Sequence, residues 1–441
     1  MRRDLHDRLV TWKRSPGRKP LLIRGARQTG KTYLLRAFGR EEYAATHYFN
    51  FEKTPDLAGF FDRDLDPRRI VGELSTHIGE KIQADSSLIV FDEIQACNAA
   101  LNSLKYFQEE AGEYHVACAG SLLGVALSTP RSFPVGKVDF VDLYPMTFFE
   151  FLDGIGESRY RGVVESHGDL HPFPDAFHHA LQALLRTYYY VGGMPEAVQE
   201  FAANRDLDAA REVQHSIADA YVLDFAKHAP THDVPKISAI WESIPRHLSR
   251  ENKKFMFSAV EKSARARDYE NAIIWLEKTG LIHRVFGVET ARVPLKGHAD
   301  RQCFKVYSLD VGLLGALAGL SPQLVVGGDR IFSEYRGALV ENFVAQHLAV
   351  TSAQDLHYWR SSGGKAEVDF LIEKEGSVLP LEVKAGVNPK SKSLKSFDAQ
   401  FAPPVLVRST LLNLKQDARI LNIPLYAISE GLRFIELVSD G

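Results

Sequence analysis

One octapeptide near the start of the chain constrains the fold more than any other feature. Residues 25–32 read Gly-Ala-Arg-Gln-Thr-Gly-Lys-Thr and fit the phosphate-loop pattern GxxxxGK[ST] at every fixed position. The apolar residues 21–23 before it predict a strand, and residues 31–40 after it predict a helix whose N-terminus points at the loop. A strand, loop and helix in this order bind nucleotide phosphates, because the backbone amides surround anionic oxygens.

The side chains of the loop suit the same purpose. Lys31 supplies a positive charge to the outer phosphates, and the hydroxyl of Thr32 suits Mg²⁺. The other loop residues that we expect to contact the nucleotide are Gly25, Gln28, Thr29 and Gly30.

A second motif lies at residues 87–93, where an apolar run ends in Asp92 and Glu93. Alone, such a run is more often a strand that ends in solvent, but its position after the phosphate loop favours a nucleotide site. Asp92 is then a ligand of Mg²⁺, and Glu93 orients and polarises the water that attacks the terminal phosphate. The paired acids favour hydrolysis over passive nucleotide binding.

Short apolar segments alternate with helical patterns through the first third of the chain. The alternation predicts five parallel strands and a three-layer α/β sheet. The expected strands are Leu21–Arg24, His47–Phe51, Leu88–Asp92, His115–Ala119 and Val138–Leu143.

Each of two further residues in this region has two possible roles. Ser121 follows the fourth strand, where it either senses the terminal phosphate or belongs to an ordinary turn. Arg131 is the nearest candidate for an arginine that a neighbouring copy inserts in a ring, which makes a homo-oligomer a further expectation. The alternative for Arg131 is a solvated loop charge.

Composition bounds the remaining possibilities. The 441 residues suffice for two to four domains, and 45% hydrophobic content suffices for packed cores. A net charge of -3 gives no global argument for nucleic acid. Three cysteines without CxxC spacing argue against disulfides or a zinc ribbon, and no signal peptide or membrane span is visible. We therefore expect a cytoplasmic protein.

These motifs resemble a family of prokaryotic AAA+-like ATPases that carry a C-terminal domain long described as uncharacterised. The resemblance covers nearly the whole chain. One departure is Gly136-Lys137, where the family usually has Gly-Arg, and lysine lacks the bidentate fork of an arginine finger. The matching elements are the phosphate loop, residues 92–95, residues 119–121, residues 143–151 and residues 192–197.

The resemblance implies a helical lid over the nucleotide after the ATPase core at residues 1–151. Residues 152–235 have the helical pattern that such a lid needs, interrupted at Tyr188–Pro195 by a paired glycine and a proline. The aromatic residues of this interruption are typical of core or hinge packing. Residues 309–314 also belong to the resemblance, but their chemistry is not evident from the sequence.

Residues 236–330 are expected to form a winged helix. Residues 240–305 contain 13 Lys and Arg against 8 Asp and Glu, and a helical pattern at residues 268–279 precedes two strands that flank a basic loop with Arg292 and Lys296. Such a domain places a helix in the DNA major groove, although many winged helices bind protein instead. Arg265 and Arg267 are the first candidates for DNA contact.

Residues 331–441 hold a second constellation: Glu341 in a helical segment, Asp369 in a strand, and Glu382 and Lys384 in the next strand. Together they resemble the PD-(D/E)XK nuclease core. Asp369 and Glu382 are then Mg²⁺ ligands, and Lys384 orients the attacking water. The basic residues that would contact DNA phosphates are Lys384, Lys390, Lys392 and Lys395.

Two functions fit this sequence. In the first, ATP hydrolysis controls DNA binding and Mg²⁺-dependent cleavage by the second constellation. In the second, the nuclease-like domain is inactive, and the protein is an ATP-switched regulator that binds DNA or protein. GTP is the less favoured nucleotide, because the guanine-reading pattern Asn-Lys-x-Asp is not present.

Overall fold

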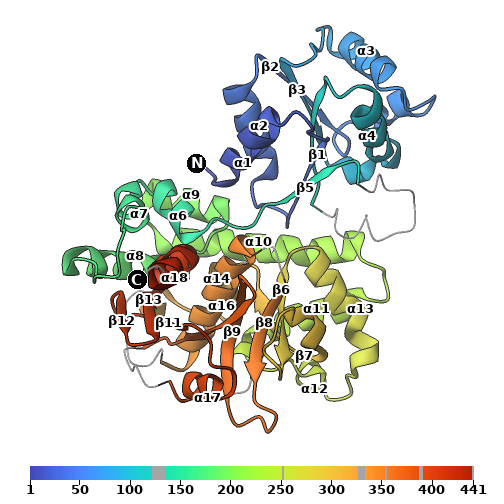
Figure 1. The fold of residues 1–441 in the computed structure, drawn as a ribbon. Coiled ribbons are helices and arrows are strands. Elements are labelled where there is room, and N and C mark those ends of the chain that lie inside the picture. The colour runs from blue at the N-terminus through green and yellow to red at the C-terminus, as the bar shows by residue number, and fades with distance from the viewer. Residues whose placement is uncertain (122–135, 251–252, 326–332, 353–354, 387–390, 440–441) are drawn as a thin grey trace. The chain divides into compact units, whose positions relative to one another are not determined.

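The computed structural model describes residues 1–121, 136–250, 253–325, 333–352, 355–386 and 391–439 (Figure 1). The chain divides into two compact units. The N-terminal unit comprises residues 1–144 and 278–280, and the C-terminal unit comprises residues 145–277 and 281–441.

The N-terminal unit is built on a five-stranded sheet with the order β2-β3-β4-β1-β5. Each neighbouring pair is parallel, as the alternation of strands and helices predicted. The strand that precedes the phosphate loop therefore lies between the fourth and fifth strands. The strands are β1 (Leu21–Arg24), β2 (Ala45–Asn50), β3 (Ser87–Asp92), β4 (His115–Ala119) and β5 (Asp139–Asp142).

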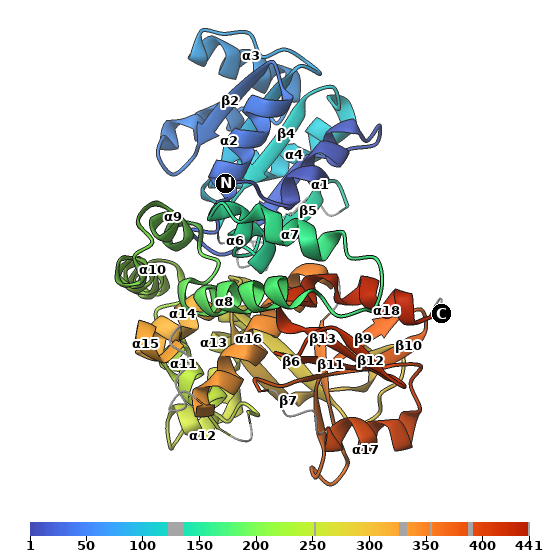
Figure 2. The same ribbon diagram turned by 90° about the vertical axis from the view of Figure 1, so that its left-hand side faces the viewer.

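Helices cover both faces of this sheet (Figures 1 and 2). Because side chains alternate along a strand, Leu21 and Ile23 of β1 pack with α1 (Leu5–Arg14) and α2 (Lys31–Glu42), while Leu22 packs on the other face. That other face is covered by η1 (Pro55–Phe61), α3 (Pro67–Ile78), η2 (Ile94–Ala96) and α4 (Asn98–Glu110). The three-layer α/β prediction is confirmed for this unit.

The C-terminal unit begins with helices, in agreement with the helical pattern of residues 152–235. The paired glycines Gly192 and Gly193 lie between α8 (Asp175–Val191) and α9 (Pro195–Asn204) and allow close approach of the backbone. A Cβ atom on Gly193 would lie 2.0 Å from the carbonyl oxygen of Met146, and one on Gly192 would lie 2.2 Å from Oδ2 of Asp310. The helices are α6 (Phe148–Gly154), α7 (Ser158–Glu165), α8 (Asp175–Val191), α9 (Pro195–Asn204), α10 (Leu207–His228), α11 (Val234–Leu248), α12 (Phe257–Val260) and α13 (Ala266–Lys278).

An eight-stranded mixed sheet forms the rest of this unit, with the order β12-β13-β11-β10-β9-β8-β6-β7. Its strands are β6 (Ile282–Val288), β7 (Ala299–Ser308), β8 (Leu356–Arg360), β9 (Glu367–Lys374), β10 (Ser377–Val383), β11 (Leu406–Thr410), β12 (Lys415–Asp417) and β13 (Ile420–Pro424). The remaining helices are η3 (Leu295–His298), α14 (Val311–Leu317), α15 (Pro322–Val325), α16 (Ser333–Thr351), α17 (Lys392–Phe401), η5 (Leu425–Glu430) and α18 (Gly431–Ser439).

The expected wing differs from the structure. β6 and β7 do form an antiparallel pair, but β6 also pairs with β8 in parallel, so the hairpin extends the large sheet. The physical reason is burial: residues 303–308 of β7 are all buried, whereas a wing strand exposes one face to solvent. The two strands expected to form a wing therefore belong to the large sheet, and the winged-helix domain and the expected domain boundaries remain predictions.

Within the described residues, none of the helices combines the length and the apolar character needed to cross a membrane. Cys97, Cys118 and Cys303 are free and buried.

Candidate functional site

The phosphate loop connects β1 to α2 through a backbone that turns repeatedly into the left-handed region. Gly25, Gln28 and Gly30 have φ angles of 147°, 64° and 93°. Only glycine fits at Gly25, because a Cβ atom there would lie 2.2 Å from the carbonyl oxygen of Leu143. Gly30 is the N-cap of α2, so the first amides of this 12-residue helix have no capping side chain. This geometry suits an anion at the helix N-terminus.

Lys31 is folded back over the loop. Its Nζ donates to the carbonyl oxygens of Gly25 at 2.9 Å and Ala26 at 2.7 Å. Burial lowers the pKa of Lys31 to about 8, although the charges of Glu93 and Asp92 oppose this shift. The ammonium is thus held among neutral carbonyls, where an anionic phosphate would stabilise its charge.

Asp92 accepts hydrogen bonds on both of its oxygens. Thr32 Oγ1 donates to Oδ2 at 2.7 Å, and the amide of Glu93 donates to Oδ1 at 3.0 Å. The hydroxyl of Tyr48 also donates to Oδ2. Thr32 and Asp92, predicted as Mg²⁺ ligands from separate motifs, therefore lie side by side and present hard oxygen atoms.

Glu93 directly follows β3 in a left-handed conformation with a φ of 49°. Ser121 Oγ donates to its Oε1 at 3.2 Å, and Gln95 Nε2 donates to its Oε2 at 2.5 Å. The structure thus brings Ser121 to the predicted catalytic acid, as its place after the strand beside β1 indicated. Strain at a non-glycine residue is typical of functional sites.

The sequence analysis missed three neighbours of this site. Arg3 donates to the carbonyl oxygens of Thr29 at 2.7 Å and Tyr144 at 2.6 Å, which ties the loop to the end of β5. Tyr48 and Asn50 reach the site because β2 pairs with β3, and Asn50 Nδ2 donates to the Tyr48 hydroxyl at 3.2 Å. To predict Tyr48 and Asn50, one would need the order of the strands in the sheet, which the sequence does not show.

Two positions, Arg131 and Lys137, were considered for an arginine finger. Arg131 lies outside the described residues. Lys137 forms an ion pair of 2.9 Å with Glu109 of the same unit.

Residues 17–152 match the AAA domain family. This match supports a P-loop, AAA-like ATPase in this part of the chain. Residues 182–324 and 336–428 match two families described as domains of unknown function, DUF8612 and DUF4143.

Full-length relatives share only part of the chain. The uncharacterized proteins Mb2031c of Mycobacterium bovis and Rv2008c of Mycobacterium tuberculosis are each 33% identical over 115 residues. That match spans 25% of this chain and 25% of each relative.

Two solved structures are similar in part. The Walker-type ATPase PABY2304 of Pyrococcus abyssi has 15% identity and a TM-score of 0.46, covering 72% of this chain and 95% of that one. The ORC1 protein of Aeropyrum pernix in complex with DNA has 14% identity and a TM-score of 0.29, covering 71% and 90%.

The second constellation lies on α16, β9 and β10 of the C-terminal unit. Glu341 is buried on α16, where Lys253 Nζ approaches its Oε1 at 2.5 Å and the Tyr307 hydroxyl donates to its Oε2 at 3.1 Å. Burial opposes ionisation of Glu341, but Lys253 and Lys305 hold its pKa below the usual value. Glu341 is therefore a carboxylate paired with two donors.

Asp369 and Glu382 are brought together by the register of β9 and β10. Leu381 pairs with Phe370, so the next step along the register places Glu382 opposite Asp369. Asp369 Oδ2 accepts from the amide of Val383 at 2.8 Å. Burial and the charge of Glu341 raise the pKa of Asp369 to about 7.

Lys384 and Glu382 form an ion pair of 2.7 Å, in agreement with their predicted position on one side of the strand. Glu382 is 2% exposed, and its Oε2 has no hydrogen-bond partner within the part of the chain that the structure describes.

Sequence reasoning missed Lys305, which enters from β7. Its side chain is 1% exposed, and Nζ forms an ion pair of 2.5 Å with Glu367. Burial opposes its charge, yet Glu367, Glu341 and Asp369 raise the pKa of Lys305 to about 12. The position of Lys305 depends on the pairing of β7 with β6, which the sequence does not reveal.

Lysine ammonium groups already lie against three carboxylates of this constellation, Glu341, Glu367 and Glu382, at 2.5–2.7 Å. Across the described residues, no group of three or more His, Cys, Asp and Glu side chains is arranged to hold a metal ion. The predicted ligand roles of Asp369 and Glu382 thus remain a prediction from the sequence alone.

The described basic residues considered for DNA contact are exposed, except Lys384, which is half-buried and paired with Glu382. Arg267 forms an ion pair with Asp268 at 3.5 Å, and Lys296 forms one with Asp355 at 3.2 Å. The other described ones are Arg265, Arg292, Lys392 and Lys395, and Lys390 lies outside the described residues.

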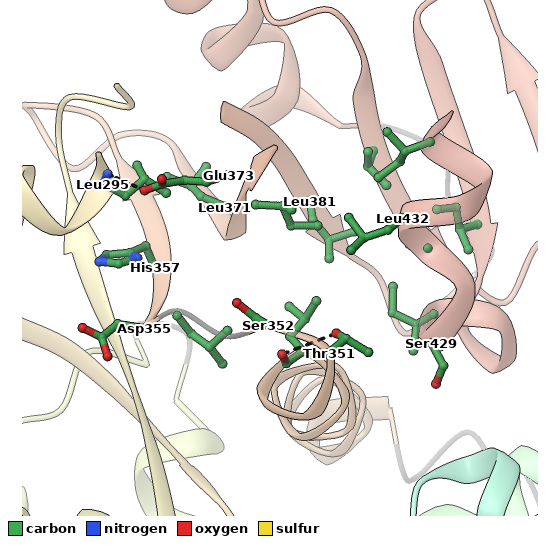
Figure 3. A pocket seen from close by; sticks show the side chains of 18 residues that line it. Leu295, Thr351, Ser352, Asp355, His357, Leu371, Glu373, Leu381, Ser429 and Leu432 are labelled. Atoms are coloured by element: carbon green, nitrogen blue, oxygen red, sulfur yellow. Dashed lines mark hydrogen bonds between the residues drawn. The ribbon is translucent and has the colours of Figure 1, made fainter. Parts of the chain in front are cut away.

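A cavity of about 190 Å³ lies apart from the predicted site residues (Figure 3). Its side chains come from the end of α16, from the strands β8–β11 and β13, and from η3, η5 and α18. The lining is mostly apolar, with Asp355, His357 and Glu373 at one end. Burial lowers the pKa of His357, so this imidazole is neutral at physiological pH.

Proposed function

We propose that this protein binds and hydrolyses ATP with Mg²⁺ at the phosphate loop, and that its nucleotide state controls DNA binding by the C-terminal unit. One observation carries the ATPase part. Residues from three separate segments, Lys31, Thr32, Asp92, Glu93 and Ser121, meet at the C-terminal ends of β1, β3 and β4. This is the edge of a parallel sheet at which ligands bind.

Each side chain then has a defined task. Lys31 leaves the carbonyls of Gly25 and Ala26 and pairs with the outer phosphates. Thr32 and Asp92 would hold Mg²⁺, which would polarise the terminal phosphate of bound ATP. Glu93 accepts the proton of the attacking water, while Ser121 and Gln95 hold its carboxylate in place.

DNA binding is supported by charge. Residues 240–305 carry 13 Lys and Arg against 8 Asp and Glu, a local surplus of 5 in a chain whose net charge is -3, although two of these cations, Lys253 and Lys305, are paired with carboxylates and little exposed. Exposed arginines and lysines neutralise phosphates, so DNA affinity should fall as salt rises. The alternative partner is an acidic protein surface. Its binding would weaken with salt in the same way, but added DNA would not displace it from this protein.

Mg²⁺-dependent DNA cleavage by Glu341, Asp369, Glu382 and Lys384 is the second candidate function. The order of elements favours it, because the helix α16 precedes three strands, β8–β10, which are followed by α17 and β11 as in a nuclease-like core. The lysines on the carboxylates argue against it.

The first experiment measures steady-state ATP turnover of the full chain and of Lys31→Ala and Glu93→Gln. Both variants should lose nearly all turnover, and Glu93→Gln should still bind ATP. Lys53→Ala is the matched control, because Lys53 is an exposed lysine of the same unit. Unchanged turnover in Lys31→Ala would exclude the phosphate loop as the source of activity.

The second experiment measures anisotropy of labelled single-stranded, duplex and branched DNA with the Glu93→Gln chain, with ATP, with ADP and without nucleotide. The proposal expects DNA affinity to differ between the ATP and ADP states. Cleavage of the same DNAs is followed in the wild type and in Lys384→Ala. Equal DNA affinity in all nucleotide states would contradict the coupling, and cleavage that disappears in Lys384→Ala would establish the second candidate.

A further inference from the structure

We propose that Lys305 and Lys253 are built-in cations of the carboxylate cluster, defined as Glu341, Glu367, Asp369 and Glu382, and that this cluster takes no divalent ion. The inference goes beyond the ATPase function and does not depend on it. A cluster that takes no divalent ion excludes metal-dependent phosphodiester cleavage by the C-terminal unit. The inference does not affect the proposed DNA binding.

Lys305 lies at the centre of the argument because it is both buried and charged. Its side chain is 1% exposed, and its ammonium touches Glu367 and lies within the field of Glu341 and Asp369. A buried ammonium is stable only when carboxylates surround it. Equally, buried carboxylates that have a lysine among them do not need a metal for charge balance.

Both oxygens of Glu341 already have partners. Lys253 Nζ is 2.5 Å from Oε1, and the Tyr307 hydroxyl donates to Oε2 at 3.1 Å. Lys384 likewise lies 2.7 Å from Oε1 of Glu382, while Oε2 of Glu382 has no hydrogen-bond partner among the described residues. Mg²⁺ requires oxygen ligands at about 2.0–2.1 Å in near-octahedral order. An ammonium group on the same carboxylate competes with such an ion for charge and space, whereas the donors to Asp92 are neutral.

Lys305 and Tyr307 are two residues apart on β7, so their side chains reach the same face of the sheet. The same segment continues to Asp310, which accepts from the amide of Gly193 at 2.6 Å and caps α14 through the amide of Leu313 at 3.0 Å. Residues 305–313 therefore contribute to the carboxylate cluster and to the contact with the paired glycines. This gives a structural role to a segment whose chemistry the sequence did not show.

The test measures Mn²⁺ binding to the full, nucleotide-free chain. Two readouts report the binding: calorimetry, and the electron paramagnetic resonance signal of free Mn²⁺. The wild type and Asp369→Asn should bind the same number of Mn²⁺ ions. Lys305→Met should gain a site that the double variant Lys305→Met/Asp369→Asn loses. Lys305→Arg keeps the positive charge and should gain none, and Lys392→Met controls for loss of an exposed lysine.

Two results would overturn the inference. The first is an Mn²⁺ site in the wild type that Asp369→Asn or Glu382→Gln abolishes, a comparison that holds even if Lys305→Met fails to fold. The second is a folded Lys305→Met chain, judged by circular dichroism, that gains no site. ATP turnover is measured on the same preparations and tests the proposed ATPase function separately. A failure of the inference about the carboxylate cluster is therefore distinguishable from a failure of the proposed ATPase function.

Discussion

Thr32 Oγ1 donates a hydrogen bond of 2.7 Å to Oδ2 of Asp92, across 60 residues of sequence. The contact joins the helix after β1 to the end of β3, two strands that are separated by β4 in the sheet. The hydroxyl and the carboxylate present adjacent oxygens, which is the arrangement that the proposed Mg²⁺ site requires.

The second hydroxyl on Asp92 should matter for metal use. Tyr48→Phe removes a donor to Oδ2 while leaving the ring and its packing. One lost hydrogen bond to a charged group should lower ATP turnover roughly two- to tenfold and raise the Mg²⁺ concentration needed for half-maximal rate. Turnover titrated with Mg²⁺ measures both effects, and Tyr106→Phe on α4 is the control. An unchanged Mg²⁺ requirement would show that Tyr48 does not position Asp92.

ATP affinity should depend on pH through Lys31. Its pKa of about 8 in the nucleotide-free chain lies below that of an ordinary lysine because of burial. The ammonium is therefore present below pH 8 and is lost as the pH rises through 8, so the dissociation constant for ATP should increase above that pH. The measurement is ATP binding to Glu93→Gln from pH 6.5 to 9.5. A Lys31→Met/Glu93→Gln chain should bind weakly and without a step near pH 8.

Loss of Lys305 should destabilise the C-terminal unit strongly. Lys305→Met removes the buried ammonium that pairs with the part-exposed Glu367 and lies near the buried Glu341, so the loss of unfolding free energy should approach, without exceeding, the about 3–5 kcal/mol of a fully buried pair. Urea unfolding measures the loss, and Glu367→Gln in the same chain should recover part of it. Arg267→Met, which breaks an exposed ion pair, should change stability by less than about 1 kcal/mol. Equal effects of the two variants would mean that the carboxylates are not held by Lys305.

The paired glycines should not tolerate a methyl group. In Gly193→Ala the new Cβ would lie 2.0 Å from the carbonyl oxygen of Met146, so the backbone must shift and stability should fall by more than about 2 kcal/mol. Gly168→Ala is the control, since a Cβ there meets nothing within 4 Å. Thermal unfolding followed by circular dichroism compares them, and similar midpoints would contradict the close approach.

The nucleotide site could be predicted almost entirely from the sequence, because its residues belong to short motifs at the ends of strands. Lys31, Thr32 and Asp92 were recognised from local spacing, and the parallel sheet then brought them together. Tyr48 could not be found in this way. Its role depends on the pairing of β2 with β3, and neighbouring strands in a parallel sheet are determined by packing across the whole unit.

The C-terminal unit was harder to predict for the same physical reason. The sequence showed Glu341, Asp369 and Glu382 but not the cations on them, because Lys253 and Lys305 come from segments that precede α16. The two strands of the expected wing were correctly predicted as a pair. The second partner of β6 is β8, which follows only after α16, and no local pattern indicates such a pairing.

The bulge between Phe286 and Gly287 divides the β6–β7 hairpin into two parts with different tolerance to change in length. From Phe286 inward the ladder is regular, and a shift of one residue would turn Lys305 away from the carboxylates and bring Phe304 or Val306 in its place. Beyond the bulge the register is already reset, so insertions or deletions at residues 289–298 can be absorbed there. Relatives of this chain should therefore vary in the length of that loop while keeping the spacing from residue 304 to residue 310.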